Sequence, residues 1–486
     1  MPAPRYPENE PEAITKTESD TTAQGSSYEV QIEGYEHPQN RSLTQKWLIV
    51  VAISSSALCV TCASSAAAFA EDGMARDFHV AKIVTILSIS LFVEGLGFGP
   101  LLVGPLSEVY GRTIIYRASF ALLFAFSWGV AFAPNIVVLL IFRFITGLCG
   151  SAFLSVAGGS VSDLFSNEEV ATPMAFYTLS PFIGPIAGPL FSGFVNQHVH
   201  WRWTFHVLII WSFVQTIALF AFVPETYVPV LRKWKAAKLR ELHADEKYWS
   251  PLDREQKHIG RSILISCYKP FQLIMYDRMA LLLNTWTAVI LGILYLAFQA
   301  FPIIFGVKHN FNMQEVGLSF LGIGIGMVGA MPTQPLWNRI LAKEASKNGG
   351  ILAPEAHLLK GQVGGILVPI GLFWLAFTTY SSVHWIVPII ASIPFGAGTY
   401  YVFSSVFTYL VTAYRPIAAS AMASNSAMRS SFAAAFPLFA KFMYDDLGTV
   451  GATALLAGLM TLMAPLPFIF RRIGPRLRAK SRFAEK

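Results

Sequence analysis

Long apolar runs alternate with short polar segments along the chain after residue 46. Each run has about 20 residues, the length at which an α-helix crosses the hydrocarbon core of a bilayer. Twelve runs are predicted to be spans, at 47–70, 84–103, 113–132, 136–161, 172–195, 204–223, 279–301, 317–341, 362–380, 385–411, 417–443 and 450–470. The expected fold class is therefore an all-α polytopic membrane protein with twelve transmembrane helices.

The polar segments divide the chain into five parts. Residues 1–46 carry eight acidic residues and almost no large apolar ones, which predicts a disordered tail. The spans within 47–223 form a first group of six, and those within 279–470 form a second. A basic central loop, 224–278, lies between the two groups, and residues 471–486 form a short basic tail.

Lysine and arginine are unevenly distributed between the two sets of loops. The central loop holds eleven and the final tail seven, whereas the loops at 133–135 and 381–384 hold none. Because positively charged loops stay on the cytosolic side, both termini and the central loop are predicted to be cytosolic. We expect the plasma membrane, with the vacuolar membrane as an alternative.

The composition agrees with a protein embedded in lipid and argues against several function classes. Hydrophobic residues make up 54% of the chain and charged residues 13%, whereas soluble domains have about 25% charged residues. The net charge of +7 comes from segments beside the spans, so no nucleic-acid partner is expected. The four cysteines lack metal-site spacing, and no P-loop or catalytic set occurs. We therefore expect no metal, no cofactor and no enzyme activity.

Three charged residues lie well inside predicted spans, far from the span ends, where a charge is costly unless it is paired or faces water. Glu94 is expected either to take part in proton coupling or substrate contact, or to be neutral and hydrogen-bonded between helices. Arg143 is expected to face a cavity, or to bond to the backbone of a neighbouring helix. Arg429 has Asn425 one turn away, and together they could present a cation and an amide to a cavity. Two arginines against one acid favour an anionic or amphipathic solute.

A short segment, 104–112, connects the second and third predicted spans. Gly104 and Gly111 permit a tight backbone turn, so we expect a hairpin at the membrane face. Glu108 and Arg112 place an acid and a base where they could hold neighbouring helix ends together in one conformation. The alternative is a solvated turn whose charges contribute less than about 1 kcal/mol.

This segment, Gly-Pro-Leu-Ser-Glu-Val-Tyr-Gly-Arg, resembles the signature loop of the major facilitator superfamily. The segment 143–150 resembles the second motif of that family, and 180–189 resembles its antiporter motif. The antiporter positions are Pro181, Gly184, Pro185 and Gly188. The segments 201–203 and 224–229 match the fungal drug:proton antiporter branch, and the resemblance extends from about residue 47 to 470.

The resemblance implies two six-helix bundles around a central cavity that opens alternately to the two sides of the membrane. It also implies a cytosolic gate in which Arg112 pairs with Asp163, near Glu108 and the glycines of the loop. The hypotheses for proton and substrate handling are Glu94, Arg143, Asn425 and Arg429. The expected function is export, by a monomer, of a small organic solute such as a secondary metabolite, toxin, drug or organic acid in exchange for protons.

Two alternatives stay open. An uptake carrier or facilitator for a small metabolite or a polyamine would have the same fold, although the antiporter motif argues against it. A non-transporting membrane receptor would need neither Glu94 nor a cavity. Such a receptor would usually carry a long folded cytosolic tail, which the sequence does not predict.

Overall fold

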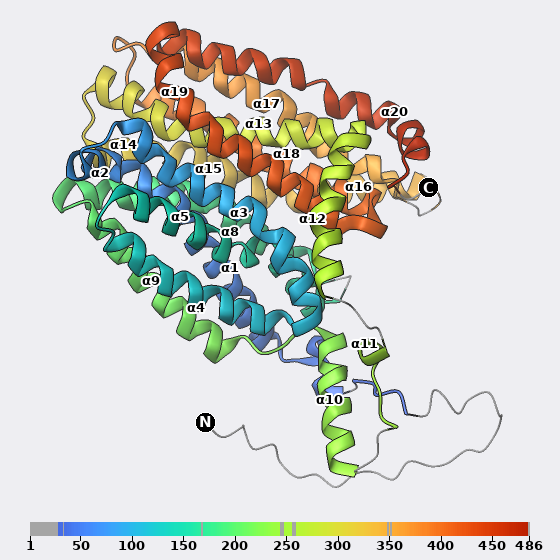
Figure 1. Ribbon diagram of the computed structural model, residues 1–486. Coiled ribbons are helices and arrows are strands. Elements are labelled where there is room, and N and C mark those ends of the chain that lie inside the picture. Colours follow the sequence, from blue (N-terminus) through green and yellow to red (C-terminus); the bar gives the residue numbers. More distant parts are fainter. Residues whose placement is uncertain are drawn as a thin grey trace.

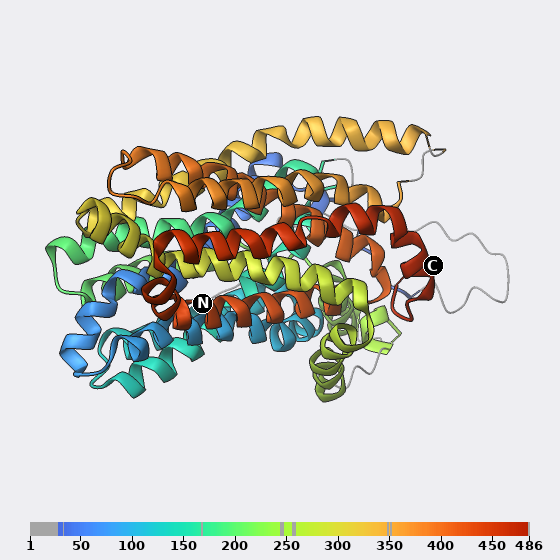
Figure 2. The same cartoon turned by 90° about the horizontal axis from the view of Figure 1, so that it is seen from above.

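The computed structural model describes residues 28–32, 34–166, 169–243, 247–254, 259–347, 349 and 352–484. These residues are helical, without any strand apart from an isolated bridge between Glu29 and Trp249. The long helices lie side by side in both views of the molecule (Figures 1 and 2). The predicted all-α fold is confirmed.

The first half of the bundle comprises the helices before residue 223. Their residues are mostly apolar, and a helix satisfies its own backbone polar groups, as lipid requires. The helices are α1 (Leu43–Ala66), η3 (Ala67–Ala70), α2 (Glu71–Phe78), α3 (Lys82–Tyr110), α4 (Arg112–Ala131), α5 (Ile136–Gly150), α6 (Ala152–Ser155), α7 (Ala157–Leu164), α8 (Ala171–His198) and α9 (Arg202–Phe222).

The central segment contains helices of its own, and the second half of the bundle follows it. The central helices are α10 (Val228–His243), α11 (Pro251–Arg254) and α12 (Ile259–Tyr276). The second half comprises α13 (Arg278–Phe301), the π-helix η4 (Pro302–Val307), α14 (Met313–Ser319), α15 (Leu321–Ala330), η5 (Met331–Thr333), α16 (Gln334–Lys347), η6 (Pro354–His357), α17 (Leu358–Phe377), α18 (Ile386–Ala413), η7 (Arg415–Ile417), α19 (Ala418–Met463) and α20 (Leu466–Lys480).

Eleven helical stretches of the described chain are long and apolar enough to cross a membrane. The last of them, Ala418–Ala479, has 62 residues, whereas about 20 suffice for one crossing. Its helix α19 bends at Gly448, whose φ of 69° and ψ of 173° are not helical. The bend divides this stretch into two spans, so the count agrees with the twelve predicted from the sequence.

The two halves touch along specific helices, and small residues bring the helices together. Within the first half α1 packs on α8 and α3 packs on α5, while α3 also contacts α19 of the second half. Helix α8 contacts both α14 and α15. A Cβ atom on Gly147 of α5 would clash with the carbonyl of Phe92 in α3, so only glycine permits this approach.

The hairpin predicted for residues 104–112 is wrong. Helix α3 continues to Tyr110 in spite of Pro105, and the chain turns at a single residue, Gly111, with a φ of 97°. Only glycine adopts this left-handed conformation without strain, so one residue suffices to end α3 and begin α4 at Arg112. Most of the motif is therefore the last two turns of a long helix.

The predicted disordered tail lies largely outside the described residues, which begin at residue 28. Its described part includes two short 3-10 helices, Gly34–Glu36 and Pro38–Asn40, and α1 begins at Leu43. Ser42 caps α1 by accepting a hydrogen bond from the backbone N–H of Gln45.

Candidate functional site

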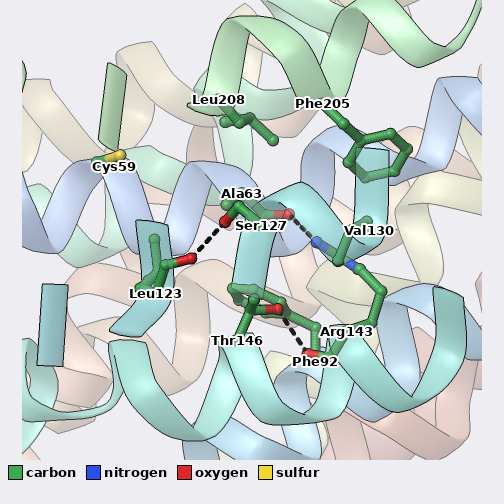
Figure 3. A pocket seen from close by; sticks show the side chains of 10 residues that line it. All are labelled: Cys59, Ala63, Phe92, Leu123, Ser127, Val130, Arg143, Thr146, Phe205 and Leu208. Atoms are coloured by element: carbon green, nitrogen blue, oxygen red, sulfur yellow. Dashed lines mark hydrogen bonds between the residues drawn. The ribbon is translucent and has the colours of Figure 1, made fainter. Parts of the chain in front are cut away.

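Arg143 lies within α5 and is bound by backbone carbonyls of neighbouring helices. Its Nε donates to the backbone carbonyl of Ser88 at 2.8 Å. Its Nη1 and Nη2 donate to the backbone carbonyls of Ala63 and Ser64, at 3.0 and 3.3 Å. The guanidinium also lies 4.3 Å from the ring centre of Phe92. Arg143 lines a narrow pocket between α1, α3, α4, α5 and α9 (Figure 3). Arg143 therefore shows both of the expected arrangements, since it lines a cavity and bonds to the backbone of neighbouring helices.

Glu94 reaches from the first half of the bundle to the second. It lies twelve residues after Lys82, the first residue of α3, or about 18 Å along the helix axis. The half-buried carboxylate accepts a hydrogen bond from Ser431 Oγ of α19 at 2.8 Å. Four residues earlier, Ser90 Oγ donates to the carbonyl of Ala434 at 2.6 Å. Glu94 is thus an ionisable group at mid-span on the contact between the two halves.

Asn425 does not join Arg429 in one site, which corrects the prediction that the two form a pair. Its amide donates to Asn284 Oδ1 and Thr287 Oγ1 of α13, at 3.0 and 2.8 Å. Asn284 donates in turn to Ser424 Oγ at 3.1 Å. Asn425 is buried against α13, and its amide nitrogen bonds to that helix, whereas its Oδ1 has no hydrogen-bond partner among the described residues.

Arg429 differs from Arg143 because no carbonyl or carboxylate binds it. Its Nε and Nη1 are buried and have no hydrogen-bond partner among the described residues. Instead the guanidinium lies 5.5 and 5.0 Å from the ring centres of Phe403 and Phe407 in α18. Phe182 of α8 stacks on Phe403 with ring centres 4.9 Å apart. Two rings of the second half therefore lie beside this cation, and a ring of the first half stacks on one of them.

The four positions of the antiporter motif lie in α8, which remains helical through its three prolines. A Cβ atom on Gly184 would clash with Thr61, and one on Gly188 would clash with Ser65 and the backbone of α1. Pro181 and Pro185 each stand three residues before one of these glycines. The motif therefore supplies a smooth face for close packing between α8 and α1.

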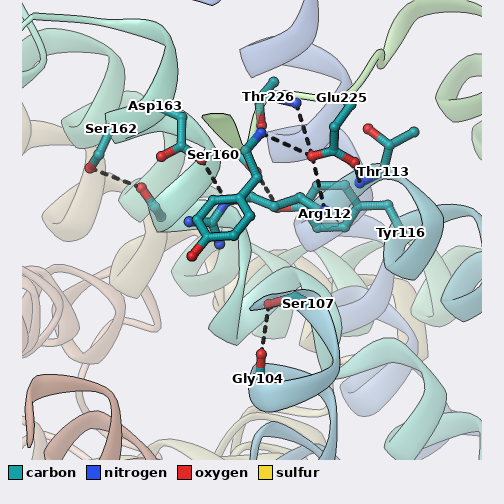
Figure 4. A network of polar contacts seen from close by, with 12 residues as sticks. Gly104, Ser107, Arg112, Thr113, Tyr116, Ser160, Ser162, Asp163, Glu225 and Thr226 are labelled. Atoms are coloured by element: carbon teal, nitrogen blue, oxygen red, sulfur yellow. Dashed lines mark hydrogen bonds and ion pairs between the residues drawn. The ribbon is translucent and has the colours of Figure 1, made fainter. Parts of the chain in front are cut away.

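A second polar cluster lies at the end of α3 and the start of α4 (Figure 4). Arg112 Nε donates to Asp163 Oδ2 of α7 at 2.6 Å, and both side chains are largely buried. The Tyr227 ring covers the guanidinium at 4.8 Å. Gly159 leaves the space that the guanidinium occupies, since a Cβ there would lie 2.7 Å from its Cζ.

The other residues of the predicted gate lie apart from this ion pair. Glu108 is exposed and forms no ion pair among the described residues. The carbonyl of Gly104 accepts a hydrogen bond from Ser107 Oγ at 2.7 Å, within α3. The cluster therefore contains Arg112 and Asp163 from the prediction, with Gly111 as the turn, but neither Glu108 nor Gly104.

Glu225 is the member of this cluster that sequence reasoning missed. Its Oε1 accepts hydrogen bonds from the backbone N–H groups of Arg112, Thr226 and Tyr227, at 3.0, 3.0 and 2.9 Å. Its Oε2 accepts from Thr113 N at 3.1 Å. A carboxylate there satisfies N–H groups at the start of α4 that have no partner within the helix. The signal was available, because Glu225 stands in the 224–229 segment that matches the family branch.

The chain is similar to known proteins over most of its length. The sequence model of the Major Facilitator Superfamily matches residues 52–437. The chain is 46% identical over 395 residues to the efflux pump atB of Aspergillus terreus, covering 80% of this chain and 83% of that protein. It is 39% identical over 448 residues to the probable drug/proton antiporter YHK8 of Saccharomyces cerevisiae, covering 92% of this chain and 87% of that protein.

Another relative and a solved structure are also similar to this chain over most of its length. The multidrug transporter mdrA of Aspergillus fumigatus is 39% identical over 457 residues, covering 93% of this chain and 74% of that protein. The xylose transporter XylE of E. coli, solved in a partially occluded inward open conformation, has a TM-score of 0.62 at 14% identity. This similarity covers 88% of this chain and 98% of XylE, and it concerns the fold alone.

Proposed function

Because the chain belongs to the major facilitator superfamily, we propose that it is a secondary active transporter that exports a small organic solute in exchange for protons. It is a multi-pass membrane protein of a family of transporters rather than enzymes. Relatives named as efflux pumps and as a drug/proton antiporter support export as the direction. Proton coupling and alternating access belong to the same proposal.

The observation that carries the proposal is the hydrogen bond between Glu94 and Ser431. A carboxylate within a span takes up or releases a proton according to whether it meets water, a partner or lipid. Since the bond joins α3 to α19, movement of one half against the other changes the surroundings of this carboxylate. Proton binding and the conformation of the bundle are thereby linked.

The cluster of Arg112, Asp163 and Glu225 serves as the cytosolic gate in this proposal. All three residues lie at the end of α3 that faces the basic central segment. The ion pair fastens α4 to α7, and Glu225 fastens the start of α4 to the beginning of the central segment. A conformation that opens this side of the bundle would have to alter these contacts, so they bias the equilibrium between the two conformations.

The proposal includes an arrangement in the membrane. The termini and the basic central segment lie in the cytosol of a monomer, and the first and second halves act as two six-helix bundles. The plasma membrane is the expected location for an exporter, and the vacuolar membrane would serve equally for sequestration of the solute.

Export is tested by comparing small molecules in the culture medium of cells with and without the protein. A solute that accumulates outside only when the protein is present is then followed in inside-out vesicles with an acidified lumen. We expect uptake into these vesicles to stop when a protonophore collapses the pH gradient.

Two results would contradict the proposal. Loss of uptake of a solute by cells lacking the protein, with unchanged export, would indicate an uptake carrier. Vesicle transport that continues unchanged without the gradient would show that protons are not the coupling ion.

A further inference from the structure

Arg429 is a buried cation without a counter-charge. Among the arginines of the described residues, it is the only one with two buried nitrogens that lack a hydrogen-bond partner. A guanidinium has five N–H donors, and leaving them unpaired away from water is unfavourable by several kcal/mol. Among the described residues no carboxylate forms an ion pair with it, and the polar groups in its surroundings include the phenols of Tyr177 and Tyr295. Both phenols already bond elsewhere, to Phe153 O and Ser64 Oγ.

The surroundings of Arg429 are aromatic on the sides where a partner is missing. The rings of Phe403 and Phe407 lie within 5.5 Å of its Cζ, so cation–π attraction offsets part of the cost of burial. Phe182 stacks on Phe403 at an interplanar angle of 15° and lies 6.2 Å from Phe407. The guanidinium thus lies beside two rings, and a third ring stacked on one of them extends an aromatic cluster that fits a flat molecule.

The position of this cluster matches that of a transported molecule. Phe182 follows Pro181 in α8 of the first half, whereas Phe403 and Arg429 belong to α18 and α19 of the second half. A ligand held here contacts both halves. Arg429 is also two residues from Ser431, the partner of Glu94, so the ligand and the proton would act on the same turn of α19.

We propose that Arg429, Phe182, Phe403 and Phe407 form the part of the substrate site that binds a planar carboxylate with a single negative charge. The carboxylate pairs with the unpartnered guanidinium, and the flat unsaturated part of the molecule lies against this aromatic cluster, in which Phe407 is the partly exposed ring. Arg143 is not part of this site, because three of its N–H groups already bind backbone carbonyls. This inference rests on the proposed transport function and specifies its substrate class.

The test is equilibrium binding to the full-length protein in lipid nanodiscs, without any gradient. The probes are planar carboxylates, each paired with its uncharged amide, beginning with 1-naphthoate and 1-naphthamide. We expect each bound carboxylate to bind at least about tenfold more tightly than its amide, because one charge-assisted hydrogen bond has about this effect. Arg429→Gln should abolish the difference, and Arg429→Lys should retain part of it.

Matched variants separate this role from a structural one. Lys441→Gln removes an exposed cation from the same helix and should leave the preference for carboxylates unchanged. Phe403→Leu should weaken the binding of the carboxylate and of its amide to a similar extent. Amide binding to Arg429→Gln shows that the variant is folded.

The proposal is wrong if no carboxylate binds the unaltered protein more tightly than its amide, or if Arg429→Gln preserves the preference. Because binding is measured without a gradient, this result is independent of the test of export. Carboxylate binding with gradient-independent transport would reject proton coupling alone, and gradient-driven export without carboxylate preference would reject this inference alone.

Discussion

At the scale of single residues, the two arginines within the spans show that the same residue type can serve opposite purposes. Arg143 donates three hydrogen bonds to carbonyls of α1 and α3 and so holds three helices together. Arg429 is left with unpaired donors beside the rings of Phe403 and Phe407. The sequence places both in apolar runs, and only the positions of neighbouring carbonyls separate them.

Glu94→Gln should abolish the dependence of transport on the pH gradient. Glutamine keeps the size of the side chain and can accept from Ser431, but it cannot exchange a proton. Vesicle transport measured over a series of external pH values should therefore be flat in this variant. Asp446→Asn, which neutralises an exposed acid of α19, is the control and should keep the pH profile of the unaltered protein. An unchanged profile in Glu94→Gln would exclude this residue as the proton site.

Glu225→Gln should destabilise the protein by about 1–3 kcal/mol, because a buried N–H group loses its acceptor. The carboxylate accepts four backbone N–H groups, and an amide nitrogen in place of one oxygen cannot accept any of them. The melting temperature of the purified protein in detergent reports the loss. Glu241→Gln changes an exposed acid of α10 and should leave that temperature unaltered. Equal melting temperatures for both variants would show that the contacts of Glu225 are dispensable.

At the scale of helices, the antiporter motif acts through the absence of side chains. The face that α8 presents to α1 depends on Gly184 and Gly188, whose missing Cβ atoms leave space for Thr61 and Ser65. The prolines of the motif are tolerated because neighbouring helices in the bundle can satisfy carbonyls that proline leaves unbonded.

Gly188→Ala should cost about 1–3 kcal/mol, the usual penalty for overpacking a closely packed contact. The added methyl group meets backbone atoms of α1, at 2.8 Å from Cys62 O and 2.9 Å from Ala66 N, which cannot move aside as a flexible side chain could. Thermal unfolding in detergent measures the effect. Gly458→Ala in α19 has open space around the new Cβ and should be neutral or slightly stabilising. An unchanged melting temperature for Gly188→Ala would mean that α1 and α8 move apart to accommodate the methyl group without loss of stability.

The sequence predicted the spans well because lipid demands about 20 apolar residues for each crossing, and this signal needs no knowledge of tertiary contacts. The prediction failed where a single residue determines the position of a turn. Gly111 alone ends α3, whereas the expected hairpin had used Gly104 as well. The family resemblance predicted the ion pair between Arg112 and Asp163. The hydrogen bond between Glu225 and the backbone of Arg112 was not predicted, because these two residues are 113 positions apart in the chain. The aromatic cluster around Arg429 joins three helices that no local pattern relates.

At the scale of the whole molecule, the halves are joined at the end opposite to the Arg112 cluster. Glu71, buried in α2 just before α3, accepts two hydrogen bonds from the amide of Gln299 in α13, both at 2.9 Å. Ser64 and Tyr295 form another contact between the same halves at 2.7 Å. Since α3 begins near Glu71 and ends beside Arg112, these contacts close the side of the bundle away from the central segment.

Cross-linking Glu71→Cys to Gln299→Cys with a short bis-methanethiosulfonate should stop transport. Separation of the two halves at this end would then be blocked, and dithiothreitol should restore activity. The background should lack Cys267, which is partly exposed, while the three buried cysteines remain. The control is Thr379→Cys with Thr449→Cys, whose parent hydroxyls lie 3.1 Å apart within the second half. Transport that persists in the cross-linked Glu71–Gln299 pair would mean that this end need not open.

The four hydrogen bonds of Glu225 also determine how the central segment follows the motion of the bundle. They hold Thr226 and Tyr227 against the first half, and α10 starts at the next residue and projects from the bundle (Figure 1). With sixteen residues, α10 is about 24 Å long. The start of α10 is thus fixed to the first half, so a rotation of that half moves the far end of α10 by a larger distance. Leu242 near that end is exposed, so a spectroscopic label there would report the rotation from outside the bundle.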